Sequence, residues 1–175
     1  ERRFRVVDLI CVEGLVEGVV ESVELRSTLI RRLDSSPVHV PNSELANAAI
    51  VNHGRRLRRR IYWKVALTYD TPVDVLREIS SRVKQYIAQN EHFVSADEAS
   101  QFVRIDSLNE SSVDMLVYCF TRSTVYGDYL EAKEELVLNI KSIVLEAGGG
   151  FAFPSRSIYV ATGENDNVEH EGLNP

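Results

Sequence analysis

The sequence has no uninterrupted apolar run that approaches the roughly 18 residues of a membrane-spanning helix. Its first five residues, Glu1 to Arg5, form neither a methionine start nor a signal peptide. These absences predict a soluble fragment of a longer protein. Because 44% of the 175 residues are hydrophobic and 26% are charged, the chain can form one or two globular domains with their own cores.

The chain has only two cysteines, Cys11 and Cys119. They lie far apart, and each belongs to an apolar, strand-like stretch, where free thiols are usually buried. We therefore expect two unpaired cysteines and a reducing compartment.

Motifs of enzymes and metal sites are also missing. The chain has no GxxxxGK[ST], no GxGxxG after a strand and no GxSxG. Its four histidines are scattered and neither CxxC nor HExxH occurs, so a zinc site is not expected. His39 and His53 are interpreted as surface or edge-strand residues. The sequence predicts a protein that is not an enzyme and that uses no metal and no cofactor.

The net charge of −6 is unevenly distributed. Residues 1–60 carry eleven arginines, no lysine and eight acidic residues, a net charge of +3. Residues 61–175 carry nine basic and eighteen acidic residues, a net charge of −9. An acidic chain is not expected to bind nucleic acid, since phosphate contacts need positive charge. The basic part could still face an anionic lipid surface or attract anions.

Four aromatic residues fall on predicted strands: Trp63, Phe102, Tyr118 and Phe120. RNA-recognition modules stack bases on strand aromatics, but the chain has no Gly-Phe-x-Phe run typical of those modules. We interpret the four side chains as core packing.

Residues 1–58 alternate apolar and polar side chains over short segments, a pattern typical of a small β-barrel. Turn residues at Glu13-Gly14 and at 34–37 separate the segments. The predicted strands are residues 6–12, 15–25, 25–33, 37–41 and 48–52. Asn42 is placed to cap the single helical turn that follows it through its side-chain oxygen. We expect an α+β protein whose N-terminal domain is a five-stranded, strongly bent Sm-like β-barrel.

Residues 59–154 form a second predicted domain, beginning with an alternating strand at 61–69. A helix follows, with Thr71 as its cap and Pro72 in the first helical position. Two further strands, at 101–108 and 113–122, precede a second helix. The apolar stripes of the two helices are Val73, Leu76, Ile79, Val83 and Ile87, and Tyr129, Ala132, Leu136, Ile140 and Ile143. With the strand that follows Gly148 to Gly150, this order is the ferredoxin-like α/β pattern.

The last part of the chain is predicted to hold a strand and a tail. Residues 155–162 form the strand, whose central residues are Arg156, Ser157, Ile158, Tyr159 and Val160. A short strand after Pro154 leaves backbone groups without partners unless another strand pairs with it, so we expect it to mediate oligomerisation. Residues 163–175 carry four acidic side chains, no Lys or Arg and no apolar period, which predicts a disordered tail.

Short motifs across the chain match those of one family. The matching residues are Phe4, Asp8, Gly14, Gly18, Pro41, Asn42, Asn52 and Arg55. They correspond to a Phe-x-x-Gly-Asp opening, a glycine turn and strand, a Val-x-Val-Pro-Asn motif and an Asn-x-Ser-Arg exit. Val7 stands where Gly is usual, and Gly54 stands where Ser is usual. Over about residues 3–160, the chain resembles the cytoplasmic domain of the small-conductance mechanosensitive channel (MscS) family.

The resemblance implies the cytoplasmic vestibule of an ion channel in the cell membrane. Subunits of this family form a ring, a heptamer in its best-known members, with side portals and a C-terminal barrel of one strand per subunit. The pore-lining helix would precede Glu1. The whole protein would release ions and small osmolytes under membrane tension after hypo-osmotic shock. The rival interpretation is a soluble oligomeric binding or scaffold module without channel activity.

A cluster of arginines lies between the two predicted domains: Arg55, Arg56, Arg58, Arg59 and Arg60. One interpretation is a solvated hinge. The other is an electropositive rim along a passage, since guanidiniums repeated by subunit symmetry would raise the local concentration of anions. The sequence leaves both interpretations open.

Overall fold

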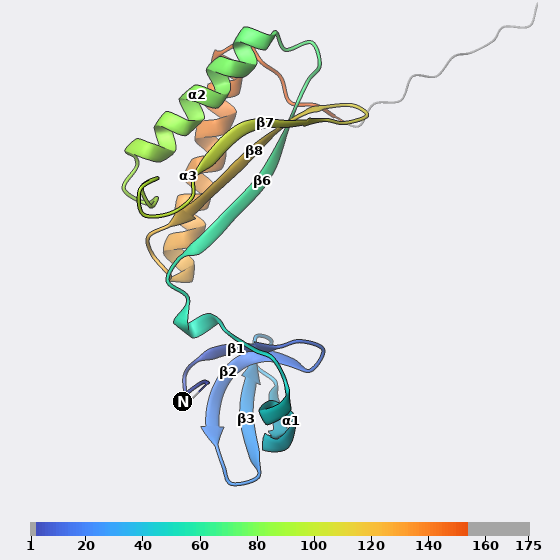
Figure 1. The fold of residues 1–175 in the computed structure, drawn as a ribbon, viewed down its shortest axis with the longest axis vertical. Helices are drawn as coiled ribbons and strands as arrows, with labels where there is room; N and C mark the ends of the chain where they lie inside the picture. Colours follow the sequence, from blue (N-terminus) through green and yellow to red (C-terminus); the bar gives the residue numbers. More distant parts are fainter. Residues whose placement is uncertain (1–2, 154–175) are drawn as a thin grey trace, which may run out of the picture.

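The computed structural model describes residues 3–153, which fold as two units stacked along the long axis of the molecule (Figure 1). The first unit holds a five-stranded sheet, and the second holds a three-stranded sheet with two helices on one side. The predicted C-terminal strand, residues 155–162, and the predicted tail, residues 163–175, lie outside the described residues.

The first sheet is antiparallel and has the strand order β4-β3-β2-β1-β5. Its strands are β1 (Leu9–Val12), β2 (Val16–Val23), β3 (Ser27–Arg32), β4 (Pro37–Pro41) and β5 (Ile50–Asn52). All five predicted strands are confirmed. The first begins later than expected because Arg5 to Asp8 form a turn, in which the Asp8 amide donates to the Arg5 carbonyl at 3.1 Å.

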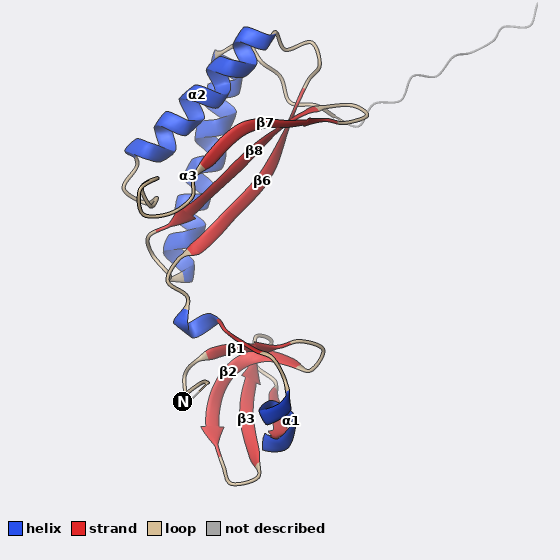
Figure 2. Cartoon of the chain, viewed as in Figure 1, coloured by secondary structure: helices blue, strands red, loops and turns tan. Residues whose placement is uncertain are grey.

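The first sheet curls at its long middle strands (Figure 2). A register shift between Val20 and Ser22 interrupts the pairing of β2 with β3, and such bulges bend a strand. Gly18 lies where the backbone of β3 comes close to β2, since a Cβ atom there would lie 2.3 Å from the carbonyl oxygen of Arg31. Glycine alone leaves room for this approach.

The curled sheet encloses a small apolar core that the helix α1 (Asn42–Asn47) closes. Because side chains alternate along each strand, every second residue points inward. The buried residues are Ile10, Val12, Val16, Val20, Ile30, Val40 and Leu45. Leu45 is the contribution of α1, so this short helix is held by packing rather than by its own length.

The predicted capping role of Asn42 is wrong. The residue is the first of α1, Pro41 holds the cap position, and no side-chain cap bond forms. The Asn42 side chain instead accepts from the Thr28 hydroxyl at 2.8 Å and donates to the Glu24 carbonyl at 2.9 Å. It therefore ties the start of α1 to the β2–β3 hairpin.

The second unit has the antiparallel strand order β6-β8-β7. Its elements are β6 (Arg59–Leu67), α2 (Val73–Gln89), β7 (Phe102–Leu108), β8 (Val113–Thr121) and α3 (Tyr126–Glu146). Both helices lie on the same side of the sheet (Figure 2). After α3, Phe151 forms a bridge with Leu67, which brings the chain back beside β6.

The two predicted helices are confirmed, with differences at their starts. Leu76, Ile79, Val83 and Ile87 are buried as expected, but Val73, the first residue of α2, is exposed. The predicted Thr71 cap is wrong: Pro72 holds that position, and the buried Thr71 hydroxyl lies 2.9 Å from that of Thr68. The Thr71 hydroxyl instead closes the turn that precedes α2.

The stripe of α3 is also confirmed at its centre. Ala132, Leu136, Ile140 and Ile143 are buried, while Tyr129 packs at the edge of the core. The helix begins at Tyr126, three residues before Tyr129, the first residue of the predicted stripe. Gly148, at φ +80°, follows its end in the left-handed conformation that glycine adopts without strain.

Interpreting the strand aromatics as core residues is right only for Trp63. Trp63 packs against the core, but Phe102, Tyr118 and Phe120 lie on the opposite face of the sheet. On β8, alternation gives one face to Val117 and Cys119 and the other to the aromatic residues. Since both helices cover the same face, the aromatic face is left open.

The two thiols are free, as predicted. Cys119 lies in the core of the second unit, where burial raises the pKa of its thiol to about 12. Cys11 is only half-buried, so the expectation of full burial is wrong for that residue. It lies on the face of β1 that points away from the core.

Val7→Gly is expected to stabilise the first unit. Val7 has φ of +71°, a region in which β-branched side chains are strained, and its side chain is 79% exposed, so the substitution removes little packing. The free energy of unfolding should rise by about 1 kcal/mol, the strain relief less the entropy that glycine adds to the unfolded chain. Urea unfolding measures the change. The neighbouring Val6→Gly, without this strain, should not stabilise, and an unchanged or lower midpoint for Val7→Gly would contradict the strain.

Candidate functional site

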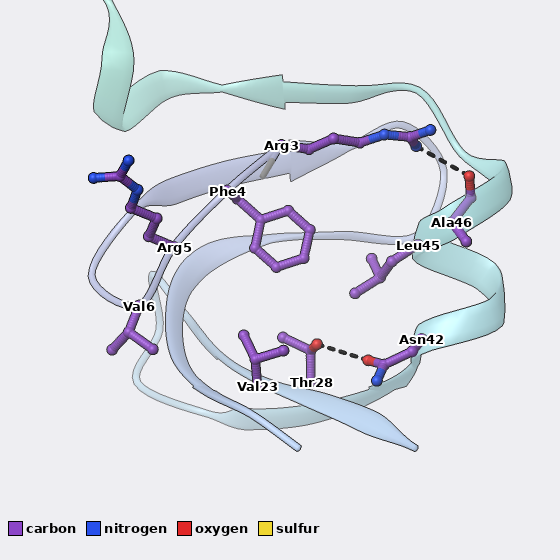
Figure 3. Close-up of a pocket in the computed structure, with 9 residues that line it drawn as sticks. All are labelled: Arg3, Phe4, Arg5, Val6, Val23, Thr28, Asn42, Leu45 and Ala46. Carbon is purple, nitrogen blue, oxygen red and sulfur yellow. Dashed lines mark hydrogen bonds between the residues drawn. The ribbon is translucent and has the colours of Figure 1, made fainter. Parts of the chain in front are cut away.

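A hollow of about 860 Å³ lies in the first unit, between the N-terminal segment and α1 (Figure 3). Its lining residues are Arg3, Phe4, Arg5, Val6, Val23, Thr28, Asn42, Leu45 and Ala46. Phe4 and Leu45 point into it, and Arg3 Nη1 donates to the Ala46 carbonyl at 3.0 Å at its edge. The lining offers apolar surface and arginine but no carboxylate, histidine or thiol, so it holds no acid–base pair.

A carboxylate beside this hollow ties the two ends of the first unit together. Asp8 Oδ2 accepts from Asn52 Nδ2 at 2.7 Å and from the Arg5 amide at 2.9 Å. Arg55 Nε lies 3.7 Å from the same oxygen. The Asn52 bond, together with the Arg5 amide and the Arg55 charge, lowers the pKa of Asp8 against the opposing effect of burial. Asp8 is therefore a charged structural tie.

The predicted motif residues take different places around this tie. Asp8, Asn52 and Arg55 come together, and a Cβ atom on Gly54 would lie 3.1 Å from Asp8 Cα, so a serine would fit there only tightly. The others lie elsewhere in the first unit: Phe4 at the hollow, Gly14 in the β1–β2 turn with φ +72°, Gly18 on β2, and Pro41 and Asn42 at the start of α1. The motif shapes the fold and brings no catalytic set together.

The five arginines of the link turn toward different neighbours. Arg55 lies by Asp8, Arg56 donates to the His53 carbonyl at 3.0 Å, and Arg58 donates to the Glu98 carbonyl at 2.6 Å. Arg59 donates to the Thr124 carbonyl and lies over Tyr126 and Tyr129, and Arg60 lies over Tyr62. Burial, and then the charge of Arg59, lowers the pKa of Arg56. Within one chain the five side chains do not converge on a single point.

Sequence reasoning missed two polar groupings in the second unit. Asp114 is buried on β8 and accepts from Ser112 Oγ at 2.8 Å and from Asn109 Nδ2 at 2.5 Å, which ties the β7–β8 hairpin. His92 lines a hollow of about 140 Å³ and lies 3.8 Å from Glu135. Asp114 directly follows an apolar residue in a buried strand, which is the signal that could have marked it.

Within residues 3–153, no three side chains among His, Cys, Asp and Glu gather as a metal site would require. None of the helices in that range is both long and apolar enough to cross a membrane.

Asp8→Asn tests the tie through pH. Because the folded-state pKa of Asp8 is lowered, its stabilisation is present above the pKa of an unfolded aspartate and is lost as pH falls through the folded value. The natural chain should therefore lose unfolding free energy in this acid range more steeply than Asp8→Asn. At neutral pH the variant should be less stable by about 1.5–3 kcal/mol, the range for hydrogen bonds to a charged group.

The control for this series is Glu13→Gln, an exposed position in the β1–β2 turn. It should keep the natural pH profile. Chemical unfolding at several pH values measures all three proteins, and parallel profiles for the natural chain and Asp8→Asn would rule out the tie.

Comparison with known families assigns both units. A model described as the β-domain of mechanosensitive ion channels matches residues 1–55. A second, described as the C-terminal region of the mechanosensitive ion channel MscS, matches residues 61–151.

Solved structures share the fold over most of the chain. The cryo-EM structure of Arabidopsis thaliana MSL1 has a TM-score of 0.80 at 24% identity. The match covers 87% of this chain and 54% of the MSL1 chain. The crystal structure of Helicobacter pylori MscS in its closed state has a TM-score of 0.75 at 21% identity. The match covers 93% of this chain and 61% of the Helicobacter pylori chain.

Curated relatives are more similar in sequence. An uncharacterised MscS family protein of Helicobacter pylori is 35% identical over 175 residues, covering 84% of this chain and 28% of the relative. The low conductance mechanosensitive channel YnaI of Escherichia coli is 32% identical over 145 residues, covering 83% and 41%. The chain thus spans less than half the length of these two relatives. With both of its units matched in the same order, the chain belongs to the MscS family of mechanosensitive ion channels.

Proposed function

We propose that the chain is the cytoplasmic vestibule of a mechanosensitive channel, and that the whole protein releases ions and small osmolytes through a tension-gated pore in the cell membrane. The observation that carries this proposal is the match of both units, in order, to the two domains of channel proteins. Relatives that bear a channel name, such as YnaI, extend well beyond the matched region. The pore is proposed to lie in that additional part.

The finer fold assignment is part of the proposal. The first unit is proposed as an Sm-like barrel, which the curled order β4-β3-β2-β1-β5 and the plug of α1 support. The second is proposed as a ferredoxin-like domain. Its strand order, with Phe151 beside β6, then β8 and β7, supports that assignment.

The assembly proposed for the vestibule is a ring of seven copies with side portals. The strand centred on Arg156 to Val160 is proposed to close a barrel around the ring axis, one strand per copy. The link arginines are proposed to rim the portals, where symmetry would bring together side chains that point apart within one chain. No nucleic acid, metal or cofactor is part of this function.

The proposal predicts current under tension. The full-length protein that contains this chain, reconstituted in channel-free liposomes, should pass current when suction is applied to a patch. An empty-liposome patch and a patch held without suction are the controls. A protein that assembles but stays silent up to the rupture tension of the bilayer would favour the rival scaffold function.

Charge at the portals should affect ion preference. Arg56 and Arg58 are changed to Gln, while Arg55 and Arg59 are kept because they hold Asp8 and α3, and Arg60 is kept because it lies over Tyr62. The reversal potential should shift toward cation preference, and more at low salt, where screening is weaker.

A matched control for the portal charges places the same loss elsewhere. Arg77→Gln and Lys84→Gln lie on the exposed side of α2, and they should leave the reversal potential unchanged. If the link variant also behaves like the natural channel at low ionic strength, the cluster is only a solvated hinge.

A further inference from the structure

The helix α3 is apolar on two sides. Its buried stripe faces the sheet, yet four large apolar residues also occupy its outer side. Leu130, Val137, Leu138 and Leu145 are 43%, 48%, 57% and 57% exposed. Their spacing of seven and eight residues keeps them on one side of the helix, and a group of large exposed apolar side chains is typical of a contact surface.

The neighbouring helix α2 has no such exposed apolar stripe on its outer side. The outward positions of α2 are mostly polar, and they include Arg77, Glu78, Ser81, Lys84 and Gln85. Both helices cover the same sheet, so their outer sides face the same direction. The outer stripe of α3 therefore marks a surface that α2 does not share.

The open face of the three-stranded sheet is the second uncovered surface. Tyr62 and Phe102 pair in register with Tyr118 from either side, with ring centroids 6.1 and 5.9 Å from it, and Phe120 lies 5.4 Å from Tyr118. Tyr62 and Phe102 are 52% and 50% exposed. The same side carries Arg60, Lys64 and Arg104. No described element lies on this face (Figure 2).

The two surfaces lie on opposite sides of a two-layer unit, so one copy cannot cover its own. Contacts between β6 and α3 show that the outer side of α3 lies directly behind the aromatic face of the sheet. Arg59 at the start of β6 lies over Tyr126 and Tyr129, and Lys133 lies over Trp63, so α3 lies behind β6. A second copy stacked on the open face in the same orientation would bring its α3 against Tyr62 and its neighbours.

Charge favours this stacking over the symmetric alternatives. The open face is basic at Arg60 and Arg104, while the exposed first half of α3 is acidic at Glu131 and Glu134. Sheet against sheet would bring Arg60 and Arg104 of both copies together, and α3 against α3 would leave the aromatic face of each copy uncovered. Head-to-tail stacking pairs opposite charges, and such a contact builds a ring when the rotation between successive copies closes.

We propose that the open sheet face of one subunit packs against the outer side of α3 of the next copy. This inference rests on the proposed ring and names the surfaces that build it in the second unit. The aromatic residues of β6 and β8 contact the apolar stripe of the neighbouring α3. The guanidiniums of Arg60 and Arg104 lie beside its acidic first half.

Cysteine cross-linking of the 175-residue chain tests the contact. In a Cys11→Ser background, Tyr62→Cys and Leu138→Cys are combined and treated with a short bis-maleimide. Cys119 stays, because its thiol is buried and protonated at neutral pH. The double variant should give a ladder of covalent oligomers up to the ring size. The matched control, Tyr62→Cys with Arg77→Cys on the polar side of α2, should give only monomer.

The outcomes separate this inference from the proposed ring. Native mass spectrometry of the natural chain reports the ring itself, and monomers there would contradict both. Rings without a ladder would overturn the contact and leave the ring standing. Dimers from Tyr62→Cys alone, or from Leu138→Cys alone, would show a symmetric contact and overturn the proposal.

A charge substitution gives an independent readout. Leu138→Glu with Val137→Glu should abolish the ring signal while circular dichroism stays unchanged, since both side chains are exposed in one copy. Leu25→Glu, on the exposed β2–β3 turn of the first unit, should keep the ring. Full rings from the double glutamate variant would also overturn the contact.

Discussion

The carboxylate of Asp8 is the contact on which the first unit and its exit depend. It joins the turn before β1 to Asn52 at the end of β5, and Arg55 in the short 3-10 helix η1 (His53–Arg55) lies beside it. The chain therefore enters and leaves the sheet at the same charged group. Gly54 approaches the Asp8 backbone closely, so a side chain there would fit only tightly. The direction in which the chain leaves toward β6 follows from this group.

Much of the fold could be predicted because local patterns and long-range structure agree. The five short strands were visible as alternation, and the stripes of α2 and α3 as three- and four-residue spacing. Gly18 and Gly148 also stand where the backbone needs glycine, one for space and one for a positive φ. These signals depend on neighbours along the chain, and tertiary contacts reinforce them.

The rest depended on which partner a side chain finds in space. Alternation shows that β8 has two faces, but not which face the helices cover, so Phe102, Tyr118 and Phe120 were misplaced. Asn42 and Thr71 look like helix caps by sequence, yet each bonds to a neighbouring turn. The link arginines read as one cluster because they are adjacent in sequence. Each follows a different contact once the two units are in place.

The pairing of β6 with β8 has a mechanical consequence. The first strand after the link is held to its partner by nine register pairs, from Arg59 with Thr121 to Leu67 with Val113. A pull transmitted from the first unit along β6 would load these hydrogen bonds in shear, all at once, instead of opening them one by one. The link around Leu57, whose side chain is exposed, would extend before that ladder yields. A pull on the first unit would therefore be absorbed between the two units, and the second unit would act as a rigid base.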